Sequence, residues 1–244
     1  VIWLVKEPKG ETEVFRLKYI AGGPLSTAEL SLNEAQQEIV HFAEICRNGF
    51  GYIREAVNEQ DPDKFDKIND KLVKYEEISD RIEYEIASFL NAVSAGDISE
   101  ETSKRIKSMY KIIGELESLG DSGESISRIL SRRNIHKKTF DQDTVKKLED
   151  MAAAVENAYD AMIANLNSAH KGQLEGISNA YNAEDRLNNL RNYLRDAEIE
   201  EIESNRKNYQ TSVYYMDSVS ELEKMGDFMI NISQALYKCK IKVS

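Results

Sequence analysis

Apolar residues recur three and four positions apart through most of the chain, which is the spacing that places side chains on one face of an α-helix. Only three prolines occur, the last of them Pro62, so the rest of the chain lacks the strongest helix breaker. The helices predicted from this pattern cover about 26–59, 61–95, 99–133, 141–169, 174–203 and 206–240. Short links between long helices favour antiparallel neighbours. The pattern therefore predicts an all-α protein of six long antiparallel helices in two tandem three-helix bundles.

The first 25 residues follow a different pattern. Residues 1–5 are apolar, residues 7–10 (EPKG) are typical of a turn, and apolar and charged residues then alternate from Val14 to Ile20. This pattern predicts a short β-hairpin or an extended arm. Residues 1–5 are equally compatible with a buried strand, whatever the parent protein.

Local signals mark several of the boundaries. Ser26 and Thr27 precede the first helix, Asp61 stands before a first-turn proline, and Ser99 precedes the third helix. The basic stretch 132–138 interrupts the pattern, and we interpret it as a linker, although a basic cluster of this kind is also suited to an acidic partner. The predicted organisation is an arm over 1–25, a first bundle over 26–135 and a second bundle over 140–241.

The two halves contain matching sequence blocks. Residues 115–121 (ELESLGD) align with residues 221–227 (ELEKMGD) at an offset of 106. Residues 80–82 (DRI) align with residues 185–187 (DRL) at an offset of 105. Two matched blocks at nearly the same offset indicate an internal duplication.

Both blocks carry an unfavourable combination of residues. Glu117 and Asp121 are four residues apart, so two like charges share one helix face, and Glu223 and Asp227 repeat the arrangement. The glycine before each aspartate lies inside a predicted helix, where glycine destabilises by about 0.5–1 kcal/mol relative to alanine. The recurrence indicates a compensating role, such as close helix approach or ligand binding.

The second helix offers a matching pair of acids, Glu76 and Asp80, which are also four residues apart. Helices two and three of a three-helix bundle pack together, so these four carboxylates can converge in one groove and bind a cation. In the second half Tyr181 stands where Glu76 would recur, which leaves a partial set with Glu184 as a neighbour. The candidate metal ligands are Glu76, Asp80, Glu117, Asp121, Asp185, Glu223 and Asp227. Carboxylate oxygens suit Mg²⁺, Mn²⁺, Fe or Zn²⁺, and bridging carboxylates can hold a multinuclear cluster.

The net negative charge of the chain disfavours some classes of binding partner. A net charge of −11 disfavours binding to nucleic acid or to an anionic lipid surface. Cys46 and Cys239 lack zinc-site spacing, and we expect both to be reduced thiols in a cytoplasmic setting. The chain has no apolar run of about 20 residues that would span a bilayer, and it opens without methionine, so we expect a soluble fragment of a longer protein.

With its duplicated Glu-Leu-Glu-x-Leu/Met-Gly-Asp blocks and its Asp80 and Asp185 partners, the sequence resembles the PhoU domain family over residues 26–240. The resemblance implies six helices in two bundles, metal ions or clusters bound by the acidic pairs, and a role in regulating phosphate uptake. The Asn231-Ile232 pair also follows the family pattern, whereas Ser125 in the first half departs from it.

The amino-terminal arm makes the chain look more like the carboxy-terminal extension of bacterial sodium-dependent phosphate cotransporters than like a free-standing PhoU protein. This resemblance implies a cytoplasmic domain of an inner-membrane protein. The implied partner is a membrane phosphate transporter, either the chain's own amino-terminal part or a separate protein, and a homodimer is a further option.

Two other functions are weighed against this one. The acidic stripes can be solvated faces of a helical scaffold that binds a partner without metal. A carboxylate-bridged di-metal enzyme is less favoured, because such sites add histidine at Glu-x-x-His spacing. Only Glu38 and His41 show this spacing near a predicted stripe, and the pair has no repeat in the second half. The sequence has no nucleophile elbow or phosphate loop either, so we do not expect an enzyme.

Overall fold

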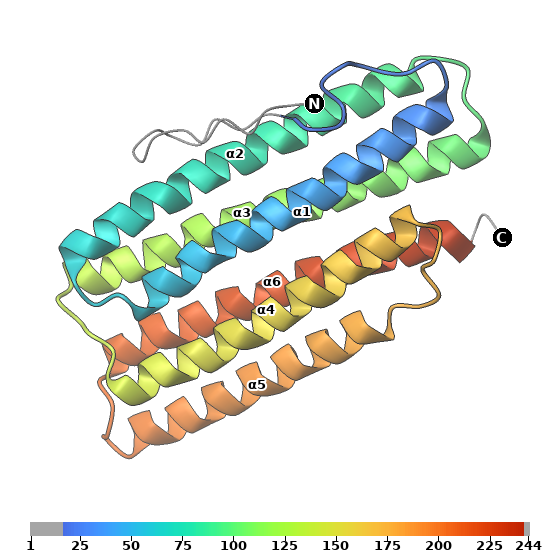
Figure 1. The fold of residues 1–244 in the computed structure, drawn as a ribbon. Helices are drawn as coiled ribbons and strands as arrows, with labels where there is room; N and C mark the ends of the chain where they lie inside the picture. The colour runs from blue at the N-terminus through green and yellow to red at the C-terminus, as the bar shows by residue number, and fades with distance from the viewer. Residues whose placement is uncertain (1–16, 242–244) are drawn as a thin grey trace.

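The computed structural model describes residues 17–241, which form six α-helices and no β-strand (Figure 1). The helices are α1 (Ala28–Asn58), α2 (Pro62–Ser94), α3 (Glu100–Ile135), α4 (Gln142–His170), α5 (Ser178–Glu203) and α6 (Tyr209–Ile241). The all-α fold predicted from the sequence is confirmed. The predicted hairpin or arm falls mainly on residues 1–16, which lie outside the described part of the chain.

The helices pack as two groups of three. Helices α1, α2 and α3 contact one another, as do α4, α5 and α6, while α3 packs along α6 and α1 along α4 to join the groups (Figure 1). Helices α2 and α5 lie on the outer sides. Because the buried apolar residues of both groups form one continuous core, the two domain boundaries predicted from the sequence stay a prediction.

Most helices begin where a side chain can accept the first free backbone N–H groups. The Thr27 hydroxyl accepts from the Leu30 N–H, Asp61 from Asp63 and Lys64, Ser99 from Thr102, and Asp141 from Thr144. Helix α5 has no side-chain cap at Ile177 and begins at Ser178, four residues later than predicted. The α4–α5 turn explains this delay, because Gly172 has φ +69° and residues 173–177 form no helix.

The stretch interpreted as a linker is partly helical. Helix α3 continues through Arg132 to Ile135, and Arg133 is fully buried. The Arg133 guanidinium donates to the Glu59 carbonyl at 2.8 Å and to Asn134 Oδ1 at 2.9 Å, and it lies over the Phe140 ring. Burial lowers the pKa of Arg133 to about 10, so the group stays charged at neutral pH. This arginine therefore ties the ends of α1 and α3 together instead of facing an acidic partner.

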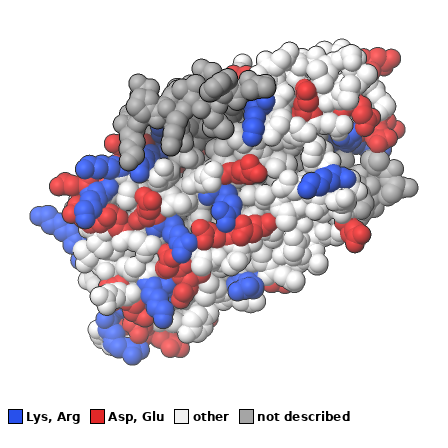
Figure 2. Space-filling model, in the orientation of Figure 1, with Lys and Arg blue, Asp and Glu red and all other residues white. Residues whose placement is uncertain are grey.

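Ion pairs and aromatic contacts cross between the two groups of helices. Arg54 of α1 pairs with Glu149 and with Glu156 of α4, the latter at 2.7 Å, and the rings of Phe50 and Tyr159 lie 5.6 Å apart. Acidic and basic side chains interleave over the face shown in Figure 2. Among the described residues, none of the helices combines the length and the hydropathy needed to cross a bilayer.

Candidate metal centre

The groove between α2 and α3 is narrow because glycine stands at the point of closest contact. A Cβ added to Gly120 would lie 2.6 Å from the Ser79 hydroxyl and 2.7 Å from the Ser79 Cβ, which is closer than real Cβ atoms come. The mid-helix glycine predicted to mark close helix approach therefore does so. This contact sets the register in which the acids of α2 face those of α3.

Three of the predicted ligands meet beside this contact. Carboxylate oxygens of Glu76, Asp80 and Asp121 all lie within 4.8 Å of one another. Glu76 is half-buried, while Asp80 and Asp121 are exposed. None of the three makes an ion pair within residues 17–241. The structure thus brings together three carboxylates that have no ion-pair partner.

Glu117, the fourth predicted ligand of this set, lies one turn from Asp121 and is half-buried. Burial, and then the charges of Asp121 and Asp80, raise the pKa of Glu117. Glu117 is close enough to feel the cluster but does not join the trio within 4.8 Å. It therefore lies at the edge of the cluster rather than at its middle.

Two members of the trio also have raised pKa values. Burial, followed by the charges of Asp80 and Glu124, raises the pKa of both Glu76 and Asp121. Glu124 and Glu83, one turn beyond the predicted ligands, extend the acidic groove and were not singled out from the sequence. Their spacing of three residues from Asp121 and from Asp80 is the signal that would have found them.

This donor set fits a hard or borderline cation. Several carboxylates without an ion-pair partner repel one another, and a di- or trivalent ion would remove that repulsion while satisfying their oxygens. Imidazole and thiolate donors are missing from the trio, so oxygen ligation is the chemistry that the centre offers.

The second bundle does not gather the equivalent residues in the same way. Glu223 pairs with Arg191 of α5 through a 3.1 Å contact between Oε1 and Nη2. Asp227 and Glu184 act on the Glu223 charge, whereas the predicted ligand Asp185 is exposed and is not among the groups that shift its pKa. No second trio of donor atoms as close as the first occurs in the described part of the chain. The neighbour Glu184, which the sequence offered as a further candidate, therefore lies nearer the groove than Asp185 does.

The helices that carry the two acidic blocks pack against each other. Asn231 of α6 donates to Glu115 Oε2 of α3 at 3.1 Å. The charge of Lys224 in α6 lowers the pKa of Asp121 in α3, although burial and neighbouring acids outweigh it. The first groove therefore lies within electrostatic reach of the second bundle.

The Glu38–His41 pair has a structural role in this fold. Glu38 is fully buried, and its Oε2 accepts from the backbone N–H groups of Lys18 and Tyr19 at 2.9 and 2.6 Å. The carboxylate thus holds the segment that leads into α1. His41 lies 3.8 Å from Glu44 in the same helix, and no hydrogen bond joins it to Glu38 in the described part of the chain.

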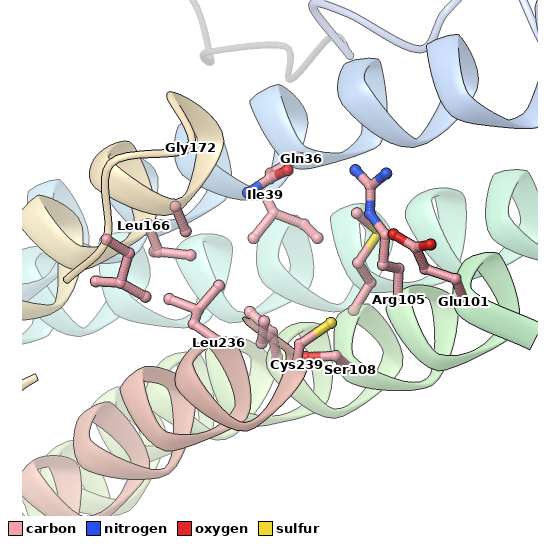
Figure 3. Close-up of a pocket in the computed structure, with 13 residues that line it drawn as sticks. Gln36, Ile39, Glu101, Arg105, Ser108, Leu166, Gly172, Leu236 and Cys239 are labelled. Atoms are coloured by element: carbon pink, nitrogen blue, oxygen red, sulfur yellow. The ribbon is translucent and has the colours of Figure 1, made fainter. Parts of the chain in front are cut away.

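A separate cavity of about 280 Å³ lies between the bundles, and its lining includes none of the acidic residues of the α2–α3 groove. Figure 3 shows apolar side chains such as Ile39, Leu166 and Leu236 on its walls, with Arg105 and Cys239 at its edge. Arg105 is already engaged by Glu29 at 3.2 Å. Helices of both bundles supply the lining, so the cavity is a feature of their junction.

One protein-family model matches part of this chain. A family model described as PhoU domain matches residues 39–130, which span the α2–α3 groove. A search of curated protein sequences finds no significant match.

Two solved structures have a similar fold. The phosphate transport system regulatory protein PhoU from Streptococcus pneumoniae superposes with a TM-score of 0.72 at 13% identity, over 88% of this chain and 97% of that one. PhoU from Pseudomonas aeruginosa superposes with a TM-score of 0.64 at 13% identity, over 88% of this chain and 99% of that one. These matches confirm the predicted resemblance: residues 39–130 match the PhoU domain model, and the six helices have the fold of PhoU proteins.

Proposed function

We propose that this chain is a regulatory domain of a phosphate uptake system and that it binds a metal ion in the α2–α3 groove. The observation that carries the proposal is the convergence of Glu76, Asp80 and Asp121, without a counter-ion, inside the segment that matches the PhoU domain. The similar structure from Streptococcus pneumoniae is named as a phosphate transport system regulatory protein, which supports the choice of system.

The acids of the groove would have different roles in binding the ion. Glu76 is the least exposed of the trio and would anchor the ion, while Asp80 and Asp121 would close over it from two helices. Glu117 would approach from the side. A bound Mg²⁺, Mn²⁺, Fe or Zn²⁺ supplies positive charge that offsets the repulsion among these acids. The ion would thereby fasten α2 to α3.

We further propose that the parent protein is a sodium-dependent phosphate cotransporter of the inner membrane, with this chain as its cytoplasmic carboxy-terminal domain. The arm predicted from the sequence of residues 1–25 supports this placement. The partner is then the membrane part of the same transporter, and the role is regulatory rather than catalytic.

Metal content tests the site. The variant Asp80→Asn/Glu117→Gln/Asp121→Asn should be purified with little metal, measured by elemental analysis beside the wild type. The control Asp66→Asn/Asp70→Asn/Asp150→Asn removes three exposed acids outside the groove and should keep wild-type metal content. Equal metal in the groove variant and the wild type would reject the site.

Phosphate uptake tests the function. Cells whose own copy carries the groove variant should take up labelled phosphate at an altered rate, while cells with the control variant should match the wild type. Unchanged uptake together with lost metal would separate the ion from the regulation. Capture of a partner by the metal-free protein would favour the metal-free scaffold.

A further inference from the structure

The two bundles differ in how their outer helix is aligned on the helix that carries the acidic block. Gly120 of α3 faces Ser79 of α2, whereas the equivalent Gly226 of α6 faces Leu187 of α5, whose side chain would lie 2.6 Å from an added Cβ. Sequence alignment pairs Leu187 with Ile82, not with Ser79. Helix α5 is therefore displaced on α6 by three residues, or about 4.5 Å, relative to α2 on α3.

The displacement changes which residues are equivalent in space. At the structural offset of 108, set by Ser79 and Leu187, Glu184 takes the place of Glu76, Asn188 that of Asp80 and Arg191 that of Glu83. The predicted partner Asp185 then corresponds to Glu77 and not to Asp80.

The charged neighbours of Glu117 and Glu223 agree with this pairing. The α2 groups that raise the pKa of Glu117 are Asp80 and Glu83, while the α5 groups that act on its counterpart Glu223 are Arg191 and Glu184. Within α5 itself, the Asn188 amide donates to the Glu184 carboxylate one turn away, so this carboxylate has a neutral partner beside it.

The charges in the two grooves consequently differ in kind. The first groove holds carboxylates at all three of these α2 positions. The second holds one carboxylate, one neutral amide and one guanidinium. Arg191 reaches Glu223 at 3.1 Å with 28% of its side chain exposed, and Glu223 is only 13% exposed.

We propose that Arg191 is a tethered cation that replaces a metal ion in the second groove, so that this chain binds metal in its first bundle only. The inference deepens the proposed function and rests on it for the first groove. The fixed guanidinium makes the closure of α5 on α6 independent of metal, whereas closure of α2 on α3 is metal-dependent. The packing of α5 on α6 is then the same with and without metal, whereas the packing of α2 on α3 depends on the bound ion.

Titration with Mn²⁺, followed by calorimetry and electron paramagnetic resonance, tests the site count. The wild type should bind at one centre, and Asp80→Asn/Asp121→Asn should abolish this binding. In that background, Asn188→Asp/Arg191→Glu restores the acidic pattern of the first groove in the second. It should restore binding of Mn²⁺ at one centre, whereas the background alone should show none.

Thermal unfolding in the presence of a chelator tests whether the Arg191 guanidinium stabilises the second bundle when no metal is bound. Arg191→Gln should lower Tm because Glu184, Glu223 and Asp227 then repel one another. Arg195→Gln is the matched control, since Arg195 is an exposed arginine about one turn further along α5 with no ion pair in the described chain, and its Tm should stay close to the wild type. Added Mn²⁺ should raise the Tm of the Asn188→Asp/Arg191→Glu protein more than that of the background.

The outcomes separate the two proposals. Wild-type Mn²⁺ binding that survives Asp80→Asn/Asp121→Asn but is lost in Glu223→Gln/Asp227→Asn overturns the tethered cation. Failure of Asn188→Asp/Arg191→Glu to gain Mn²⁺, or equal Tm values for Arg191→Gln and Arg195→Gln, overturns it too. A wild type that binds no Mn²⁺, beside an Asn188→Asp/Arg191→Glu protein that does, rejects the metal site of the first groove and keeps the role of Arg191.

Discussion

Arg133 is the largest side chain that the fold fully encloses, and its donors satisfy the carbonyl at the end of α1. Replacing it with methionine keeps most of the volume but leaves the Glu59 carbonyl and the Asn134 side chain without this donor. We expect Arg133→Met to lower the free energy of unfolding by about 1–3 kcal/mol in urea titration. The exposed neighbour variant Arg132→Met should stay within about 0.5 kcal/mol of the wild type.

Gly120 and Gly114 both lie inside α3 but in different surroundings. A Cβ at position 120 would collide with Ser79, while a Cβ at position 114 meets no atom within 4 Å. Gly120→Ala should therefore destabilise the fold by about 1–3 kcal/mol, because α2 and α3 must move apart. Gly114→Ala should stabilise it by about 0.5–1 kcal/mol through helix propensity.

Chemical denaturation of both alanine variants checks this contrast. Adding Ser79→Gly to Gly120→Ala removes both atoms of the collision and should recover part of the loss. A Gly120→Ala protein as stable as Gly114→Ala would show that the helices do not approach as closely as described.

At the scale of helices, the α2–α3 groove should make stability depend on pH. Burial and like charges raise the pKa of Glu76 and Glu117 above 4.5 and that of Asp121 above 3.8, so the folded metal-free protein binds protons more tightly there than the unfolded chain does. These groups destabilise the fold above their raised pKa values, and the destabilisation fades as the pH falls through those values.

The measurement is Tm in chelator for the wild type and for Asp121→Asn. The wild type should gain Tm relative to the variant as the pH falls from about 7 to about 5. Saturating Mn²⁺ should reverse the trend, because the ion favours the ionised carboxylates. A constant difference between the two proteins at all pH values would contradict the raised pKa values.

The helices were largely predictable, since periodic apolar residues and caps such as Asp61 and Ser99 are local signals. The convergence of Glu76, Asp80 and Asp121 was also foreseen, because spacing of four along two adjacent helices suffices to bring them together. The arrangement of the second groove was not foreseen. The register of α5 on α6 depends on how Leu187 packs against Gly226, which is a contact between segments distant in the sequence. Sequence alignment of the repeats pairs Asp80 with Asp185 and is blind to a shift of one turn. Arg191 therefore gave no signal in the sequence, where its aligned counterpart is the buried Ile86.

On the scale of the molecule, the shared core predicts one cooperative unfolding transition. Cys46 in α1 is buried with a pKa raised to about 12, whereas Cys239 in α6 is only half-buried at the edge of the cavity between the bundles (Figure 3). A thiol reagent should modify Cys239 in the native protein and Cys46 only on unfolding.

Pulsed labelling of Cys46 along a urea gradient should follow the same curve as helix content from circular dichroism. The Cys239→Ser variant isolates the signal of Cys46. Exposure of Cys46 at a lower urea concentration than the loss of helix would show that the bundles unfold separately.

The back-to-back packing of α3 and α6 links the two grooves. Glu223 and Lys224 are consecutive in α6, yet Glu223 pairs with Arg191 in its own groove while the Lys224 charge reaches Asp121 in the other. A cation entering the first groove is therefore repelled by a charge that belongs to the second bundle. Since such coupling is reciprocal, the ion repels Lys224, and with it α6, by the same free energy. A bound ion and the Lys224 charge would thus weaken each other's interaction with Asp121 by the same free energy.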